Sequence, residues 1–212
     1  MFIGQALTRA DIQAIFKSGS EGMCKSAVTL FELPFEGSFL SNGGDVGISQ
    51  GVTFDTGYLG LGALFNDVDT LFYATEDNIY LGQGALEFWL KPLWNGNDEQ
   101  SYVFFEIGQE WFNRMRVMKD GANNFRFMIW SPTEEYDAAF NVADWEANEW
   151  HHVRVTWTSN EMSLYLDGDL KDVQQGIDLP GYLAPTINIG FTAIEEHKAN
   201  AVIDEFKIFS NP

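Results

Sequence analysis

The sequence predicts an all-β fold, either a sandwich or a barrel of antiparallel strands. After Cys24, short runs rich in Val, Ile, Phe, Tyr and Trp recur between clusters of Gly, Asn, Asp and Pro, the pattern of strands separated by turns. The chain has 212 residues, of which 45% are hydrophobic and 15% aromatic, enough to bury the core of one large β domain. We therefore expect a single domain over residues 25–212.

Seven segments carry the clearest strand pattern. They are Ala85–Lys91, Tyr102–Ile107, Phe125–Trp130, Trp150–Trp157, Met162–Leu166, Thr186–Phe191 and Val202–Phe209. Successive side chains of a strand point to opposite faces, so Leu86 and Phe88 fall on one face and Glu87 and Trp89 on the other. We expect the first face to be core and the second to be polar or to face a ligand.

The same alternation of side chains applies to two adjacent histidines in the expected strand Trp150–Trp157. His151 and His152 must point to opposite faces of their strand, so they cannot share a metal ion or act as a pair. We favour a structural role, in which each imidazole hydrogen-bonds a neighbouring strand or loop. Asp167 and Gly168 supply the residues that a tight hairpin turn needs.

Charge and cysteine content exclude several functions. The chain has 31 acidic and 12 basic residues, and its net charge of -19 disfavours binding to nucleic acid or to anionic membranes. This excess of acid fits a solvated surface or bound divalent cations. Cys24 is the only cysteine, so an intrachain disulfide or a cysteine-rich zinc site cannot form. No stretch approaches the roughly 18 apolar residues of a membrane span, and residues 1–24 lack the pattern of a signal peptide.

One family resemblance rests on a run of motifs. Trp150–Trp157, followed by Leu164–Gly168, resembles laminin G-like and pentraxin-like domains of the concanavalin A-like lectin/glucanase superfamily. Further matching stretches occur in the expected order: Leu33–Ser38, Gly62–Phe65, Glu87–Pro92, Ile187–Gly190 and Ile203–Phe206. The resemblance covers the chain from about Val28 to its end. It implies a two-sheet antiparallel jelly-roll sandwich and a non-catalytic binding or adhesion module of a larger extracellular or cell-surface protein.

The N-terminal segment is the exception to the strand pattern. Leu7–Phe16 reads as one short helix, with Thr8 as its cap and Asp11 completing a capping box. Residues 1–6 can be laid over residues 207–212, and the helix resembles the tail that follows the last strand of such modules. Residues 1–24 are thus the closing strand and helix of a preceding repeat in a tandem array, or they stand in for this domain's own missing tail by packing against it. The alternative is a genuine N-terminal helix of a complete small protein.

Catalysis has no support in the sequence. Retaining glycosidases need two carboxylates about 5 to 5.5 Å apart, which laminarinase-like relatives take from an E-x-D-x-x-E strand. That motif does not occur here. Glu87, Glu106, Asp204 and Glu205 lie in expected strands, but none has acidic partners two and five residues further on. We expect no catalytic residues and no enzyme activity.

The resemblance also implies a structural calcium ion. In laminarinase-like relatives, a cation often joins the first strand, a turn after the second strand and an acid in the last strand. The corresponding residues are Pro34 or Glu36, Asp67 and Asp204. Asp204 is the strongest candidate because it shares a strand face with apolar Val202, and a carboxylate facing the core needs a cation or several donors. Acceptance of hydrogen bonds from loop amides is the alternative.

Three aromatic residues are candidates for sugar contacts. Trp94, Trp111 and Tyr136 lie in polar, turn-like stretches where the core is less in need of a large aromatic. We expect a polysaccharide or glycoprotein as the partner, besides neighbouring domains of a larger protein. The alternatives are a structural spacer repeat without a small ligand and, less favoured, a glycan-active enzyme.

Overall fold

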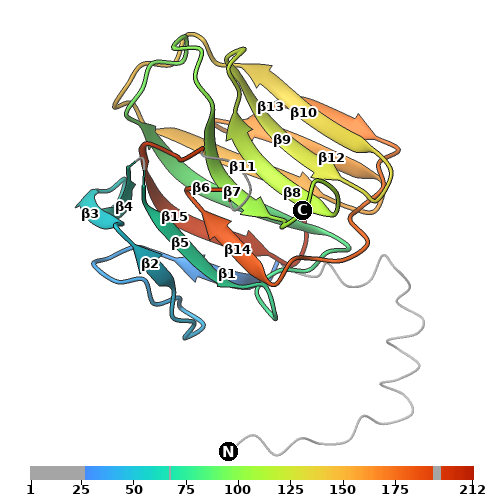
Figure 1. Ribbon diagram of the computed structural model, residues 1–212, viewed down its shortest axis with the longest axis horizontal. Helices are drawn as coiled ribbons and strands as arrows, with labels where there is room; N and C mark the ends of the chain where they lie inside the picture. Colours follow the sequence, from blue (N-terminus) through green and yellow to red (C-terminus); the bar gives the residue numbers. More distant parts are fainter. Residues whose placement is uncertain (1–26, 67, 193–196) are drawn as a thin grey trace, which may run out of the picture.

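The computed structural model describes residues 27–66, 68–192 and 197–212, which form two antiparallel sheets packed face to face (Figure 1). The described residues contain fifteen strands and no helix, and thus no helix that could cross a membrane. The expected N-terminal helix, Cys24 and Asp67 lie outside the described residues. The expected two-sheet jelly-roll sandwich is confirmed.

The larger sheet has eight strands. Its order is β13 (Asp169–Gln175), β12 (Glu161–Leu166), β11 (His151–Trp157), β6 (Gly84–Pro92), β15 (Ala201–Phe209), β4 (Leu61–Phe65) and β3 (Thr53–Thr56), and β1 (Thr29–Leu33) also pairs with β15. The seven-stranded sheet has the order β10 (Glu135–Asn141), β9 (Asn124–Trp130), β8 (Arg114–Lys119), β7 (Tyr102–Ile107), β14 (Thr186–Ile189), β5 (Thr70–Ala74) and β2 (Ile48–Gln50). Strands distant in sequence are neighbours in both sheets, as in β6 beside β15.

All seven strands expected from the sequence are present, as β6, β7, β9, β11, β12, β14 and β15. Alternation places their faces correctly: Leu86 and Phe88 are fully buried, whereas Glu87 and Trp89 are half-buried. Strand β8, with the sequence Arg-Met-Arg-Val-Met-Lys, was not among the expected strands: its first four residues alternate, but it has a single β-branched residue and no aromatic one. Every residue of β8 is buried.

The core lies between the two sheets. Phe206 is at its centre, with ring centroids 5.8 Å from Phe88, 6.2 Å from Phe31 and 6.3 Å from Phe105. Phe105 belongs to the seven-stranded sheet and the other three rings to the eight-stranded sheet. This contact between layers accounts for the apolar residues of their facing sides.

Hydrogen bonds join several loops at one end of the sandwich. In the loop after β6, Gly96 donates its amide to the carbonyl of Trp145 at 2.8 Å. Asn123, in the turn after β8, accepts the amide of Val142 at 2.9 Å through its carbonyl. Asp167 lies at the same end, in the turn after β12, and it contacts the start of β11. Chain segments that are far apart in sequence therefore meet here.

The hairpin turn expected at Asp167 and Gly168 is present. Both residues have positive φ angles, 54° and 84°, as the tightest hairpin turns require. The amide and the carboxylate of Asp167 both bond to the backbone of His152, at 2.8 Å each. The turn is therefore tied to β11.

Candidate functional site

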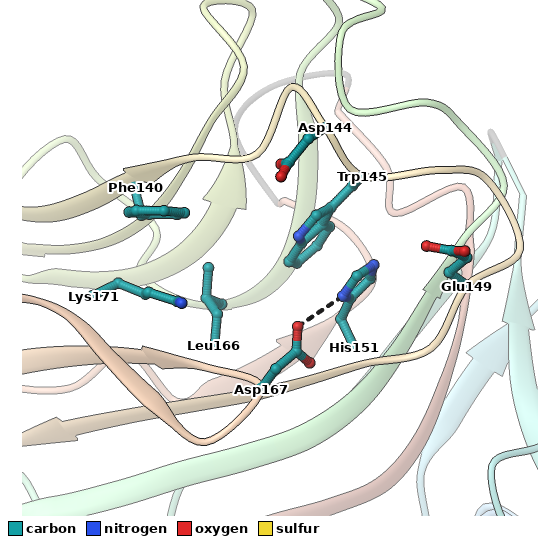
Figure 2. A pocket seen from close by; sticks show the side chains of 8 residues that line it. All are labelled: Phe140, Asp144, Trp145, Glu149, His151, Leu166, Asp167 and Lys171. Atoms are coloured by element: carbon teal, nitrogen blue, oxygen red, sulfur yellow. Dashed lines mark hydrogen bonds and ion pairs between the residues drawn. The ribbon is translucent and has the colours of Figure 1, made fainter.

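A pocket of about 320 Å³ opens where these loops meet (Figure 2). We call it the His151 pocket. Its lining residues are Phe140, Asp144, Trp145, Glu149, His151, Leu166, Asp167 and Lys171. They come from the end of β10, the β10–β11 loop, the start of β11 and the β12–β13 hairpin. The volume lies at the lower end of the range for small-ligand sites.

One wall of the pocket is a stacked pair of rings. The imidazole of His151 lies 3.7 Å from the indole of Trp145, and the two planes are 2° from parallel. Nδ1 of His151 is 3.0 Å from Oδ2 of Asp167 (Figure 2). Because a carboxylate accepts, Nδ1 carries the proton and Nε2 is left as an acceptor in the neutral ring. Nε2 is buried and has no hydrogen-bond partner among the described residues.

The mouth of the pocket is polar, with one exposed aromatic ring. The carboxylates of Asp144 and Glu149 bond to no described residue and are open to solvent. Phe140 is 41% exposed, and the ammonium of Lys171 lies 5.1 Å from its ring centroid. Lys171 also donates to Asp169 at 3.2 Å.

This arrangement is suited to holding a ligand rich in hydroxyl groups. Asp144 and Glu149, without partners among the described residues, can accept hydrogen bonds, Lys171 can donate them, and Phe140 offers an apolar face. None of the described residues that line it is a serine, threonine or cysteine, so these residues place no hydroxyl or thiol nucleophile beside His151 and Asp167. The described residues also include no group of three or more His, Cys, Asp or Glu that could hold a metal ion.

A second pocket adjoins the first. It measures about 360 Å³ and is lined by Asn95, Asn97, Ala143, Asp144, Trp145 and Glu146. We call it the Asn97 pocket. It shares Asp144 and Trp145 with the His151 pocket. The two pockets therefore adjoin as neighbouring compartments at these two residues.

Trp94 does not lie in this site as an exposed aromatic. The expectation that it is available for stacking is wrong, because only 4% of its surface is exposed. Its indole donates to the carbonyl of Ala199 at 3.1 Å and stacks on Tyr102 at 4.6 Å. Trp94 therefore closes the end of the core.

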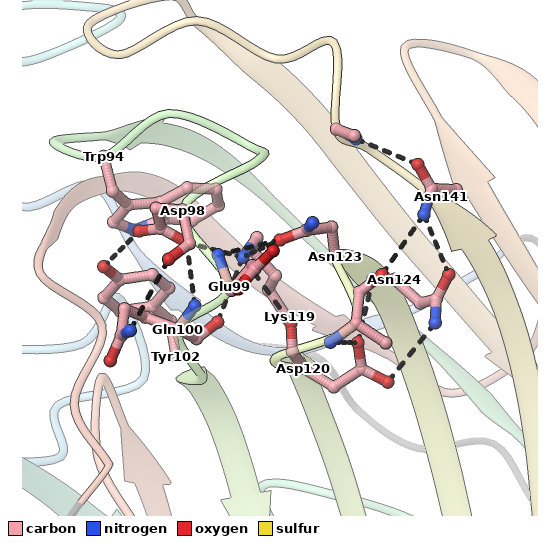
Figure 3. A network of polar contacts seen from close by, with 12 residues as sticks. Trp94, Asp98, Glu99, Gln100, Tyr102, Lys119, Asp120, Asn123, Asn124 and Asn141 are labelled. Atoms are coloured by element: carbon pink, nitrogen blue, oxygen red, sulfur yellow. Dashed lines mark hydrogen bonds and ion pairs between the residues drawn. The ribbon is translucent and has the colours of Figure 1, made fainter.

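A buried lysine explains this packing (Figure 3). Lys119 is fully buried below the rings of Trp94 and Tyr102, 5.4 and 5.6 Å from their centroids. Its ammonium donates to Asp98 at 2.8 Å and to Asn123 at 3.0 Å. Burial alone would raise the pKa of Asp98, but hydrogen bonds from Lys119, Tyr102 and the chain hold that pKa below its ordinary value. The network fixes the loop that carries the Asn97 pocket.

The other two aromatic candidates lie apart from the pockets. Trp111 is 62% exposed in the loop between β7 and β8 and lies beside Arg114, whose guanidinium is 5.1 Å from its ring. Tyr136 is half-buried in β10, and its hydroxyl donates to Glu134 at 3.0 Å. Neither residue lines the His151 pocket or the Asn97 pocket. Their contact with sugar stays a prediction.

Asp204 is fully buried, as its strand face indicated, and backbone amides surround it. Its carboxylate accepts from Leu59 at 3.0 Å, from Glu205 at 2.8 Å and from Tyr58. Burial raises its pKa, and these amides oppose the shift. The structure thus supports the reading in which loop amides hold Asp204.

The remaining calcium candidates do not complete a cation site within the described residues. Glu36 is exposed, and its carboxylate accepts the amide of Leu61 at 3.3 Å. Pro34 can offer only its carbonyl, and Asp67 lies outside the described residues. The carboxylates of Asp204 and Glu36 accept backbone amides, and the described residues alone do not supply a complete set of calcium ligands. Because Asp67 lies outside the described residues, calcium binding stays a prediction.

The outward face of β6 and β11 carries an aromatic cluster that the sequence only partly indicated. Trp89 stacks on Tyr58, with centroids 3.5 Å apart and planes 7° from parallel, and lies 5.0 Å from His152. Alternation placed Trp89 and His152 on this face, opposite His151. Tyr58 comes from the loop that Asp204 anchors, and no local pattern brings it here.

Comparisons with known proteins agree with the observed fold. The laminin G-like family model of the concanavalin A-like lectin/glucanases superfamily matches residues 67–212. The chain therefore has the architecture of a laminin G-like module. It belongs to the concanavalin A-like lectin/glucanases superfamily. Among curated protein sequences, none matches this chain.

Solved structures of similar fold include binding domains. Domain 4 of AbnA, an extracellular arabinanase from Geobacillus stearothermophilus solved with arabinotriose, has a TM-score of 0.73 and 13% identity, covering 88% of this chain and 94% of that domain. The binding domain of botulinum neurotoxin DC with SialylT has a TM-score of 0.68 and 17% identity, covering 88% of this chain and 48% of its own. The corresponding domain of Paraclostridial Mosquitocidal Protein 1 gives 0.70 and 16%, covering 86% and 49%. This chain thus spans about half the length of the latter two, and the likeness establishes the fold.

Proposed function

We propose that this protein is a non-catalytic glycan-binding module and that the His151 pocket holds the glycan. The observation that carries the proposal is the combination of an apolar ring, two free carboxylates and an ammonium around one small hollow. Carboxylates accept from sugar hydroxyls, Lys171 donates to them, and the ring of Phe140 packs against the apolar face of a sugar. Two proteins of similar fold, solved with arabinotriose and with SialylT, support the same class of ligand.

The same proposal includes where the module acts and what it binds. A fold shared with an extracellular arabinanase and with toxin binding domains supports action outside the cell, as one module of a larger protein. A polysaccharide or a glycoprotein is then the partner. The high negative charge supports neither a nucleic acid nor an anionic membrane as that partner.

A glycan-array screen followed by calorimetry of the strongest ligand tests the function and its location. We expect Phe140→Ala and Asp144→Ala to weaken binding about tenfold each, the loss of roughly one good contact. Trp111→Ala serves as the matched control, because it removes a more exposed aromatic outside the pocket. Binding lost with Trp111→Ala but kept with Phe140→Ala would move the site to the β7–β8 loop.

Two further results would overturn the function itself. If no glycan binds, either with calcium or with a chelator, the binding function is wrong and a structural spacer role is favoured. If the bound oligosaccharide is shortened on incubation, as chromatography of the products would reveal, the module is an enzyme.

A further inference from the structure

We propose that the ligand is a neutral oligosaccharide of at least two sugar units, which fills the His151 pocket and the Asn97 pocket together. The proposal rests on the glycan-binding function above and names the class of glycan. Its basis is the adjacency of the two compartments, which share Asp144 and Trp145. A ligand confined to one of them would leave the polar groups of the other unused.

The Asn97 pocket is equipped to bind a second unit. The side-chain amide of Asn97 bonds to no described residue, so its carbonyl and its amino group are both free. The carboxylate of Glu146 is also without a partner in the described chain. An amide that donates and accepts, beside a carboxylate that accepts, can pair with neighbouring hydroxyls of one sugar.

The relative position of the two compartments is set before the ligand arrives. The amide of Ala147 donates to Oδ1 of Asn95 at 3.0 Å, and Gly96 donates to Trp145 at 2.8 Å. A Cβ at position 96 would lie 1.8 Å from the carbonyl oxygen of Val142, so the two loops touch with no room for a side chain. A preformed spacing favours one linked ligand over two separate ones, since less order is lost on binding.

Charge selects against acidic sugars. The His151 pocket contains three carboxylates, on Asp144, Glu149 and Asp167, against the single ammonium of Lys171. The Asn97 pocket contains Asp144 and Glu146 and no cationic side chain. A uronate or a sialylated unit would place another negative charge among these groups, and that repulsion lowers affinity. Hydroxyl groups are instead attracted to the same carboxylates.

Calorimetry with ladders of one to six units, prepared from arabinan, galactan and β-glucan, tests the inference on the full chain. We expect the two- or three-unit member of one ladder to bind at least about tenfold more tightly than its single unit. Asn97→Ala should weaken the longer ligand about five- to tenfold and leave the single unit unchanged. Asn160→Ala, an exposed asparagine beyond the far end of β11, should change neither.

The acidic form of the best ladder provides the charge test. Oxidation of its primary alcohols to carboxylates keeps the backbone and adds charge, and we expect affinity to fall at least about tenfold at low salt. Equal affinity for one and three units, or tighter binding of the oxidised form, overturns this inference while glycan binding stands. Failure of every ladder and of the glycan array overturns the proposed function as well.

Discussion

The imidazole of His151 lies flat on the indole of Trp145, with centroids 3.7 Å apart, while Asp167 holds its Nδ1 from the other loop. The two loops that frame the His151 pocket therefore meet at one ring. A buried aromatic pair contributes about 0.5–1.5 kcal/mol beyond its area. The hydrogen bond contributes less, because the side chain of Asp167 is 47% exposed.

This relationship predicts a ranking of two variants. His151→Ala removes the stack and the bond, and we expect the free energy of unfolding to fall by about 2 kcal/mol. His151→Phe keeps the stack, so its loss should stay below about 1 kcal/mol. Urea unfolding followed by tryptophan fluorescence measures both. Equal losses would mean that the bond to Asp167 dominates.

Trp94 is predicted to act on stability and not on ligand affinity. Trp94→Phe keeps a ring above Lys119 but loses the donor to Ala199, and we expect a loss of about 1–2 kcal/mol. Glycan affinity of the folded variant should equal that of the wild type. Thermal unfolding and calorimetry measure the two quantities, and a loss of affinity without a loss of stability would restore Trp94 as a ligand contact.

The Lys119–Asp98 pair predicts a large effect of removing one partner. Lys119→Met leaves a partly buried carboxylate without its cation, and we expect a loss of about 2–4 kcal/mol at pH 7. The double variant Lys119→Met with Asp98→Asn should lose less than the sum of the single variants. A double-mutant cycle by urea unfolding measures the difference, and strict additivity would show that the pair is not coupled.

The direction of the Asp98 pKa shift adds a pH dependence. The pKa is lowered on folding, so the ionised carboxylate stabilises the fold at pH values above its ordinary pKa of about 3.9. That stabilisation is lost as the pH falls through the lower value of the folded state. We expect Asp98→Asn to flatten the acid limb of the stability curve below about pH 4. An unchanged limb would contradict the assignment.

Asp204 is predicted to anchor the loop that carries Tyr58. Asp204→Asn replaces one acceptor oxygen by a donor that faces backbone amides, and we expect a loss of about 1–3 kcal/mol. Because burial raises its pKa, the folded state binds this proton more tightly than the unfolded state. The contribution of Asp204 to the free energy of unfolding therefore grows as the pH falls through the raised pKa, and it levels off below about pH 3.9. Urea unfolding of the wild type and of Asp204→Asn measures the difference between their free energies of unfolding. We expect this difference to grow as the pH falls, and a difference that shrinks would contradict the prediction.

The fold could be predicted because its evidence is local. The alternation of Leu86, Glu87, Phe88 and Trp89 assigns faces within one strand, and the turn at Asp167 needs only its own backbone angles. Strand β8 was missed because its charged residues are buried against partners from other segments. For example, Nε of Arg116 donates to the carboxylate of Glu106 at 2.7 Å. Local patterns cannot register such partners.

The candidate site could not be predicted for the same reason. Trp94, Trp111 and Trp145 lie in similarly polar loops, and only the first two were candidates, but their exposed fractions are 4%, 62% and 8%. Their exposure differs because residues from other strands cover two of them: Lys119 lies under Trp94, and His151 lies on Trp145. The pockets form only where loops from separate hairpins meet, and that meeting depends on the register of both sheets.

His152 predicts a pH dependence in the opposite direction to that of Asp204. Burial against Trp89 lowers its pKa below the ordinary value of 6.5, and the nearby charge of Arg154 acts in the same direction, against Glu87. The unfolded chain therefore takes up this proton first, so stability falls as the pH drops through 6.5 and levels off below the folded pKa. His152→Phe keeps the contact with Trp89 and removes the titration. Urea unfolding at pH 7.5 and pH 5.5 should give a smaller drop for the variant, since the other histidines are common to both proteins; an equal drop would mean that His152 is not the group responsible.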